Sequence, residues 1–373
     1  MSGWHDRTLV DLLAAYGLTG AVERPFPTDG WSGASFSALE RDGRRYVLKR
    51  MSLAVDWIAR ATADADLREA WLADASDTRW PAGLTAPYLG AAADGEGAAI
   101  LMPDLSADLI AWDRPGDSAI DAPALARLLR AMARLHASPW SLGLEASAAS
   151  AGLGLPPWCP LPERLLLLAR PAARAYAAAG NPVGERFLAG WDAFDRSASS
   201  AARDLVEGLS LEPGPLMRVL ASLPSVGLHG DLKLANVALL RADDVGLIDW
   251  QLTLRAPVAV ELGWFLVANS GLLAERPERV LDGYRASIAR ASRGSGSGPD
   301  VVAAGSIRDV HDVVGDWAVQ ADLAWIVGLL LRGWRKGLDA EAGTPTGWGA
   351  SGIDDLAWWC DRAVAAAGRC LPT

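Results

Sequence analysis

The first hundred residues alternate short apolar runs with polar turns, a pattern that is typical of β-strands. The runs FSALE (36–40) and RYVLKR (45–50) flank the turn RDGR, and an Asp-Gly pair between apolar runs indicates a hairpin. AAILM (98–102) predicts a further buried strand, because it is a continuous apolar run after the turn DGEG. Residues 55–74 carry apolar side chains at helical spacing. This part of the chain therefore predicts a small sheet that carries one helix.

From about residue 121 the apolar spacing becomes helical, as in APALARLLRAMARLHA (122–137). Two short apolar runs, VALL (237–240) and VGLI (245–248), interrupt this pattern and predict a second hairpin around RADD. Glycine-rich segments at 293–300 and 341–352 are predicted to be loops. The remaining predicted helices cover 161–179, 183–208, 213–223, 258–291, 301–336 and 353–369.

Together these patterns predict an α+β protein with two lobes. The small lobe would span residues 1–102 and the large, mostly helical lobe residues 103–373, with a connector near 102–105. A chain of 373 residues is long enough for two such lobes, at about 150 residues each.

Composition narrows the class of partner. The formal net charge of −10 argues against nucleic acid, which needs a basic surface, and is compatible with a cationic small substrate. Three cysteines without a CxxC pattern predict a reduced, cytoplasmic protein. The segment MSGWHDRTLV lacks the apolar core of a signal peptide, and no apolar run approaches the roughly 20 residues of a membrane span, so no membrane association is expected.

The segment HGDLKLAN (229–236) places polar side chains at close intervals in apolar surroundings. Asp231 and Asn236 precede the predicted second hairpin, and Asp249 of IDWQ follows it. Because a hairpin brings its two ends together, Asn236 and Asp249 should lie side by side and offer oxygen ligands to a hard cation such as Mg²⁺. Asp231 would then be available to orient or deprotonate a hydroxyl. His229 is expected to be structural.

The predicted small lobe supplies a matching set of residues. Lys49 ends the strand RYVLKR, where a buried lysine needs a partner, and Glu69 on the following helix could provide it, with Asp64 and Asp66 as competitors. The turn DGWSGAS (29–35) contains Gly33 and Ser35, and its backbone N–H groups could face phosphate oxygens. An ordinary hairpin loop remains an equal alternative for this turn. The whole set predicts phosphoryl transfer.

These motifs resemble those of the aminoglycoside phosphotransferase family, small-molecule kinases with a protein-kinase-like fold. HGDLKLAN resembles the catalytic loop of that family, and IDWQ (248–251) resembles its metal-binding segment. VLKR (47–50) matches the strand with the lysine, and ILMPDL (100–105) resembles the connector that holds adenine. Glu261-Leu262 resembles the acidic motif that opens the next helix. The resemblance covers roughly residues 20–270.

The resemblance implies a role for each matching residue. It makes Asp231 the catalytic base or the group that orients the hydroxyl, and Lys233 a neighbour of the γ-phosphate, at a position where many members carry another residue. The implied cofactors are ATP and Mg²⁺. The implied nucleotide-binding residues are Lys49, Glu69, Gly33, Ser35, Met102 and Asp104, and the implied metal ligands are Asn236 and Asp249.

The acceptor is less constrained. Only 11 residues separate Asp249 from Glu261, which leaves no room for the peptide-binding segment of protein kinases and favours a small-molecule hydroxyl acceptor. An amino sugar, an aminoglycoside or another antibiotic, a choline-like alcohol or a sugar all remain open. A helical set of carboxylates could bind amino groups, although a solvated helix face is the more common use of such a pattern. This set is Asp309, Asp312 and Asp316.

One alternative function remains open at this point. A nucleotide-binding regulatory pseudokinase would commonly lack the lysine, the catalytic aspartate or the metal-binding aspartate, whereas this chain carries Lys49, Asp231 and Asp249.

Tryptophans cluster near the C-terminus and are expected to be mostly core residues, with an aromatic wall for a ring-shaped acceptor as the minority interpretation. A monomer and a homodimer are both compatible with the sequence, and so are ATP and GTP.

Overall fold

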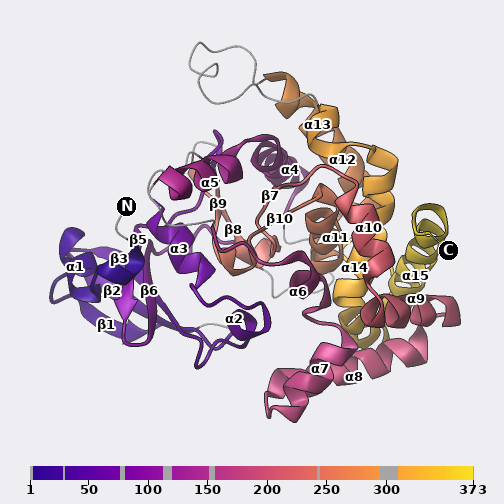
Figure 1. Cartoon of the computed structure of the whole chain (residues 1–373), viewed down its shortest axis with the longest axis horizontal. Helices are drawn as coiled ribbons and strands as arrows, with labels where there is room; N and C mark the ends of the chain where they lie inside the picture. The colour runs from indigo at the N-terminus through magenta and orange to yellow at the C-terminus, as the bar shows by residue number, and fades with distance from the viewer. Residues whose placement is uncertain are drawn as a thin grey trace. The chain divides into compact units, whose positions relative to one another are not determined.

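The computed structural model divides the chain into two compact units, each built from segments that are distant in sequence (Figure 1). It describes residues 3–27, 30–75, 80–111, 120–150, 156–241, 244–294 and 310–372. Unit 1 comprises Met1–Leu109, Trp140–Pro160 and Asn236–Thr253. Unit 2 comprises Ile110–Pro139, Leu161–Ala235 and Leu254–Thr373. The second hairpin thus belongs to unit 1, and the expected division into lobes of residues 1–102 and 103–373 stays a prediction.

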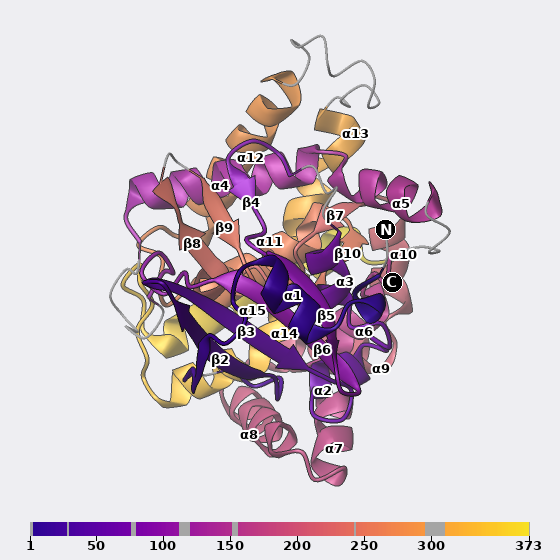
Figure 2. The same ribbon diagram turned by 90° about the vertical axis from the view of Figure 1, so that its left-hand side faces the viewer.

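Unit 1 is built on an antiparallel five-stranded sheet with the strand order β1-β2-β3-β6-β5 (Figure 2). The predicted hairpin is present as β2 and β3, in which Phe36 pairs with Lys49, and the predicted strand AAILM lies within β6. The strands are β1 (Val22–Pro25), β2 (Ser35–Arg41), β3 (Arg44–Met51), β5 (Gly90–Asp94) and β6 (Gly97–Pro103).

The two faces of this sheet are buried by different helices. Successive side chains of a strand point to opposite faces, so Leu48 and Lys49 of β3 face opposite ways. Leu48 packs with the cluster that includes Leu12 of α1 (Leu9–Ala15). Val47 packs with the cluster that includes Ala70 of α3 (Arg68–Asp74), and Lys49 points to this same side. The alternation of β3 thus places the lysine under α3.

The prediction of one helix over residues 55–74 is wrong, because two shorter helices occupy this stretch. Asp56 caps α2 (Trp57–Ala61) by accepting a hydrogen bond from the N–H of Ala59 at 3.0 Å. Ala63 and Leu67 both have φ of 50° and end the helical path between α2 and α3. The apolar spacing predicted the burial of this stretch, but it carries no information about residues with a positive φ that interrupt a helix.

The predicted second hairpin is confirmed. β8 (Val237–Leu239) pairs antiparallel with β9 (Val245–Leu247), and β4 (Leu84–Thr85) pairs parallel with β9. The short 3₁₀ helix η4 (Trp250–Leu252) follows, and it begins directly after Asp249. Two helices of unit 1 were not predicted: α1, which is short, and α5 (Trp140–Ser150), whose leucines, alanines and serines form no polar face.

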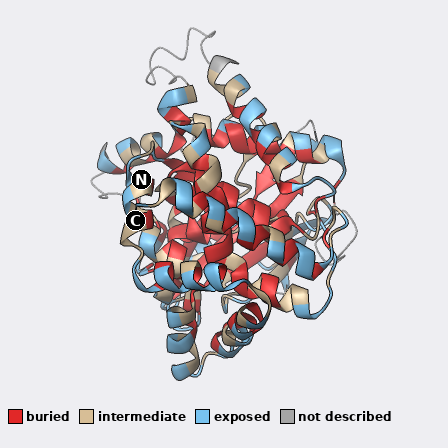
Figure 3. Ribbon diagram, turned by 90° about the vertical axis from the view of Figure 1, so that its right-hand side faces the viewer, coloured by how far each residue is buried: buried red, intermediate tan, exposed pale blue. Residues whose placement is uncertain are grey.

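Unit 2 is mostly helical: its outer helices expose one side and bury the other, whereas the helix Val258–Asn269 is buried almost all round (Figure 3). Its two short strands, β7 (Val226–Leu228) and β10 (Leu254–Ala256), pair antiparallel beside the segment HGDLKLAN. The predicted stretch 301–309 and the loop residues 295–300 lie outside the described residues. The helices are α4 (Ala122–Ala137), α6 (Leu161–Leu166), α7 (Arg170–Ala178), α8 (Pro182–Ser197), α9 (Ser200–Leu211), α10 (Gly214–Ala221), α11 (Val258–Asn269), α12 (Pro277–Gly294), α13 (Val310–Val314), α14 (Trp317–Glu341) and α15 (Gly352–Cys370).

Helix α14 forms the core of unit 2 and packs against α8, α11 and α15. It approaches α8 so closely that a Cβ atom at Gly337 would lie 2.3 Å from the backbone nitrogen of Phe194. Within the described ranges, the stretch Val310–Glu341 is the one helical segment long and apolar enough to cross a membrane. Most of its apolar window is nevertheless buried inside the protein, as in the core helix of a globular unit.

Candidate active site

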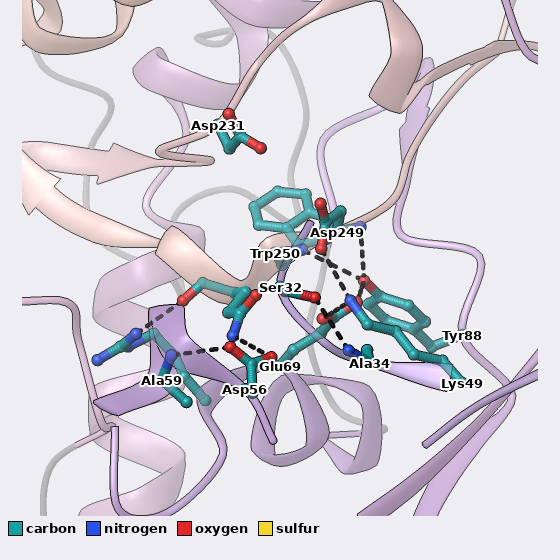
Figure 4. A network of polar contacts seen from close by, with 12 residues as sticks. Ser32, Ala34, Lys49, Asp56, Ala59, Glu69, Tyr88, Asp231, Asp249 and Trp250 are labelled. Atoms are coloured by element: carbon teal, nitrogen blue, oxygen red, sulfur yellow. Dashed lines mark hydrogen bonds and ion pairs between the residues drawn. The ribbon is translucent and has the colours of Figure 1, made fainter. Parts of the chain in front are cut away.

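Lys49 stands at the centre of a buried ion-pair network in unit 1 (Figure 4). Its Nζ donates to Oε2 of Glu69 at 2.5 Å and to Oδ1 of Asp249 at 2.8 Å. The side chains of Lys49 and Glu69 are 3% and 0% exposed, whereas that of Asp249 is 34% exposed. The lysine therefore joins the sheet, α3 and the end of the second hairpin, and Glu69 is the partner that the structure selects over Asp64 and Asp66.

The two carboxylates of this network stabilise the charge of Lys49. Burial alone would lower the pKa of Lys49, but the carboxylates of Asp249 and Glu69 outweigh it and raise the pKa well above the ordinary value. Burial raises the pKa of Glu69, and the positive charge of Lys49 only partly offsets this effect. Lys49 is therefore a permanent cation held in one position, which suits a residue that contacts phosphate oxygens.

Tyr88 completes the network and was not predicted from the sequence. Its hydroxyl donates to Oε1 of Glu69 at 2.7 Å and accepts a hydrogen bond from the N–H of Asp249 at 3.1 Å (Figure 4). Asp249 has φ of 66°, a left-handed conformation that is uncommon outside glycine. Tyr88 thus fixes both the carboxylate that holds Lys49 and the backbone that presents Asp249. A single tyrosine before a buried strand gives no sequence signal for such a role.

The second hairpin brings Asn236 and Asp249 to the same end, as expected. Val237 pairs with Leu247, and the N–H of Ile248 donates to the carbonyl oxygen of Asn236 at 3.1 Å. An amide and a carboxylate oxygen at this place fit a Mg²⁺ ion that keeps water ligands. No group of three or more His, Cys, Asp or Glu side chains suited to a metal occurs among the described residues, so any metal here would depend on this sparse oxygen set.

The turn before β2 has a conformation that requires glycine at one position. Gly33 has φ of 96°, and a Cβ atom there would lie 2.3 Å from the carbonyl oxygen of Val55. The turn is anchored on α2, because the N–H of Trp57 donates to Ser32 O at 3.0 Å. Ser35 opens β2 and pairs with Arg50. The turn is thus held firmly, although its contact with phosphate stays a prediction.

The predicted adenine connector begins at the C-terminal end of β6. Met102 pairs with Val47 and is buried at 6% exposure. Asp104 accepts hydrogen bonds from the N–H and hydroxyl of Ser106, and its carboxylate lies 3.4 Å from Nε of Arg45. Asp104 therefore stabilises the turn after the strand, and the role of both residues toward a nucleotide stays a prediction.

In unit 2, the segment around Asp231 is held by Glu261 of α11. Oε1 of Glu261 accepts the N–H of Gly230 at 2.7 Å, and its Oε2 lies 2.8 Å from Nε2 of His136. Burial would raise the pKa of Glu261, but the hydrogen bond and charge of His136 outweigh it and lower the pKa. Arg164 adds a hydrogen bond from Nε to Gly230 O at 2.7 Å. From the sequence, Glu261 was known only by its position in a motif, and no sequence pattern pointed to Arg164.

Asp231 itself is nearly buried, with a side chain that is 11% exposed. Its Oδ2 accepts a hydrogen bond from Nζ of Lys233 at 2.8 Å. The N–H of Asp231 lies 3.2 Å from Nδ1 of His229, a fully buried side chain. Asn269 holds the following turn by accepting the N–H of Leu234 at 2.9 Å. The arrangement presents one restrained carboxylate, and it gives His229 the structural role that was expected.

Two of the three carboxylates proposed to bind an amino group, Asp312 and Asp316, lie in unit 2, just before α14 and at its start. Asp309 lies outside the described residues. Asp316 caps α14 by accepting the N–H of Ala318 at 2.8 Å, and Asp312 is exposed on α13. Both line a groove with residues of α10 and α15. Of the C-terminal tryptophans, Trp325, Trp334 and Trp359 are buried, as core residues are.

Comparison with known proteins places this geometry in a family context. The model of the phosphotransferase enzyme family matches residues 24–298. No curated protein matches the chain significantly.

Three solved structures illustrate the structural similarity. The aminoglycoside phosphotransferase APH(4)-Ia, in a ternary complex with ADP and hygromycin B, is 13% identical over 98% of this chain and 100% of its own, with a TM-score of 0.41. An aminoglycoside phosphotransferase from Alicyclobacillus acidocaldarius is 14% identical over 95% of each chain, with a TM-score of 0.37. A choline kinase from Cryptosporidium parvum is 10% identical over 94% of this chain and 88% of its own, with a TM-score of 0.44.

Proposed function

The chain belongs to the phosphotransferase enzyme family, and we propose that it transfers the γ-phosphoryl group of ATP to a hydroxyl group of a small molecule. The observation that carries this proposal is the contact of Lys49 with both Glu69 and Asp249. Burial of a lysine together with two carboxylates costs desolvation free energy, so such an arrangement points to a functional role. A lysine, a helix glutamate and a strand-end aspartate form the set that positions phosphates in kinases.

The residues of unit 1 would bind the nucleotide. Lys49 would contact the α- and β-phosphates, and Glu69 and Tyr88 would keep its ammonium group in place. Gly33 would allow the turn before β2 to present backbone N–H groups to phosphate oxygens. The adenine would lie along the connector at Met102 and Asp104.

Asn236 and Asp249 would hold Mg²⁺, which supplies neutralisation of phosphate charge when it is bound. The protein's own contribution is to fix these two side chains at one end of the β8–β9 hairpin. Asp249 is also held through its N–H by Tyr88.

Asp231 would position the acceptor hydroxyl and receive its proton. The hydroxyl oxygen forms a new bond to the γ-phosphorus, the bond from that phosphorus to the β,γ-bridging oxygen breaks, and ADP leaves. Asp231 is held for this task through Gly230, which Glu261 and Arg164 both bind. Catalysis of this kind is mainly positioning and charge stabilisation. Such a reaction on a soluble metabolite or antibiotic fits a cytoplasmic enzyme.

The proposal is tested by ADP release from Mg²⁺–ATP with a panel of amines, sugars, hydroxy acids and antibiotics. We expect at least one acceptor to be phosphorylated, and we expect Lys49→Met to raise the KM for ATP. The control is Arg24→Gln, which removes a cation from β1, at the edge of the same sheet, and should change nothing. If no acceptor stimulates ADP release and Lys49→Met binds ADP as wild type does, the proposal is wrong.

A regulatory pseudokinase is the alternative from another class. It would bind ADP with a dependence on Lys49 and release no phosphorylated product with any acceptor. Product analysis by mass spectrometry separates the two functions, because only the kinase adds a phosphoryl group to a panel compound.

A further inference from the structure

A cluster of arginines lies beside Asp231 in unit 2. Arg332 and Arg335 are three residues apart on α14 and therefore share one face of the helix. The guanidinium of Arg332 lies 5.4 Å from the ring centre of Trp264, and that of Arg164 lies 4.7 Å from the same ring. Arg164 also donates to Gly230 O, the residue before Asp231. Two guanidinium groups thus share one indole next to the candidate catalytic loop.

The cluster is richer in positive than in negative charge at its centre. Arg335 pairs with Asp339 at 2.9 Å, one turn further along α14. Arg332 has no hydrogen bond or ion pair within the described ranges, and its contacts are the ring of Trp264 and longer-range charges. Burial, with repulsion from Arg335 and Arg186, outweighs the attraction of Asp339 and Asp231 and lowers the pKa of Arg332 to about 10. A bound anion would relieve this repulsion.

Asp316, one of the carboxylates expected to bind a cationic acceptor, is remote from this cluster. Asp316 caps the start of α14, 16 residues before Arg332, so the two lie about 24 Å apart along the helix axis at 1.5 Å per residue. A cationic acceptor near Asp231 would meet Arg332 and Arg335 instead. The net charge of the whole chain, −10, does not describe this local environment.

We propose that the acceptor is an anionic hydroxyl compound whose carboxylate or phosphate group binds Arg332 and Arg335, beside Asp231. The proposal rests on the proposed phosphotransfer and adds the class of acceptor. Guanidinium groups suit this task, because their planar N–H groups match the oxygens of carboxylates and phosphates. The contact of Arg332 with the ring of Trp264 does not use the N–H groups of the guanidinium, which leaves them for the acceptor.

Turnover tests the proposal with two series of acceptors, in each of which the members share a carbon skeleton and differ in charge. One series is glucose, glucosamine, glucuronate and glucose 6-phosphate, and the other is glycerol, serinol, glycerate and glycerol 3-phosphate. We expect anionic members to have the highest kcat/KM, and the carboxylate and phosphate arms show which oxyanion is preferred. Higher kcat/KM for cationic or neutral members would overturn the proposal while leaving phosphotransfer intact.

The variant Arg332→Gln then tests whether Arg332 is a residue that binds the anionic group of the acceptor. For an anionic acceptor we expect KM to rise by about ten- to a hundredfold, as for the loss of a charge-assisted contact, with a smaller change in kcat. Arg332→Lys should recover part of the loss. The matched control is Arg362→Gln, because Arg362 also lies 5.4 Å over a tryptophan ring, that of Trp358, but pairs with Glu278 on the surface. An equal fall in kcat for acceptors of every charge would mean that Arg332 only positions Asp231, and would overturn the proposal.

If neither series is turned over, calorimetry can still measure the binding of glycerate and of inorganic phosphate to the protein in the presence of Mg²⁺–ADP. Binding that Arg332→Gln abolishes and Arg362→Gln preserves supports the anion site. Equal binding to wild type and Arg332→Gln, or none to either, overturns it. Both variants must retain wild-type ADP affinity and melting temperature. Failure of the proposed function itself is distinct: Asp231→Asn would then match wild type with every acceptor.

Discussion

Oε1 of Glu261 accepts the backbone N–H of Gly230 at 2.7 Å, which ties helix α11 to the residue that precedes Asp231. The other carboxylate oxygen contacts His136, so one buried side chain joins α4, α11 and the loop HGDLKLAN. The catalytic role proposed for Asp231 requires a carboxylate in a fixed position, and this contact helps to hold its backbone in place.

Glu261→Gln is therefore expected to destabilise the protein. The substitution removes the charge that pairs with His136, and loss of one partner of a buried pair costs about 3 kcal/mol in the free energy of unfolding. Urea unfolding measures this change. Glu341→Gln, which removes the partner of Arg196 in an exposed pair, is the matched control and should have no measurable effect. Similar values for the two variants would contradict the anchoring role.

Asp231→Asn should abolish most of the turnover and leave ADP affinity unchanged. A general base typically contributes about 10²- to 10⁴-fold to kcat, and the amide cannot accept the hydroxyl proton. Single-turnover kinetics and ADP titration measure the two quantities. Lys233→Met, which removes the hydrogen-bond partner of Asp231 at 2.8 Å, should have a smaller effect. A loss of ADP affinity in Asp231→Asn would argue against its assignment to the acceptor.

Asp249→Asn should raise the Mg²⁺ concentration needed for half-maximal ADP release by more than about tenfold, since removal of even an outer partner of a metal ligand costs about 10- to 100-fold. Glu69→Gln is the matched control, because Glu69 also binds Lys49 but is not a proposed ligand. It should raise the KM for ATP without changing the Mg²⁺ requirement. The same shift in both variants would show that Asp249 acts only through Lys49.

Gly33→Ala should weaken both stability and ADP binding. Alanine would combine an unfavourable φ of 96° with a Cβ atom only 2.3 Å from Val55 O. Gly43→Ala isolates the first cost, because Gly43 has φ of 73° with nothing within 4 Å of a Cβ atom. We expect Gly43→Ala to cost about 1 kcal/mol in the free energy of unfolding and Gly33→Ala to cost more. Unchanged ADP affinity in a folded Gly33→Ala would remove this turn from the nucleotide site.

Asp64 predicts a pH dependence of stability. Burial raises its pKa from 3.8 to about 6, despite the attraction of Arg68. The folded protein therefore holds a proton that the unfolded chain has lost between pH 4 and 6, so this residue lowers stability as the pH rises through that window. Relative to Asp64→Asn, the wild type should lose about 2 kcal/mol between pH 4 and pH 7. Parallel urea unfolding of both proteins measures the difference, and a pH-independent difference would contradict the buried carboxylate.

The sequence by itself determined most of the elements and much of the candidate chemistry. Alternation in RYVLKR placed Lys49 on a strand, and turn residues defined both hairpins, because these signals are local. The order of HGDLKLAN and IDWQ indicated phosphoryl transfer for the same reason. The sequence did not predict the break between α2 and α3, since apolar spacing reports burial and not the left-handed residues Ala63 and Leu67.

Only the tertiary structure decided which distant groups meet. It selected Glu69 as the partner of Lys49 and added Tyr88 to that pair. It also brought Arg164 and Arg332 to the ring of Trp264, where the local charge is positive although the net charge of the chain is negative. Arg332 is one of 35 basic residues in the sequence, and nothing in its neighbours along the chain marks it. Its importance follows from the fold, because electrostatic interactions depend on separation in space and on burial, and neither is encoded by local pattern.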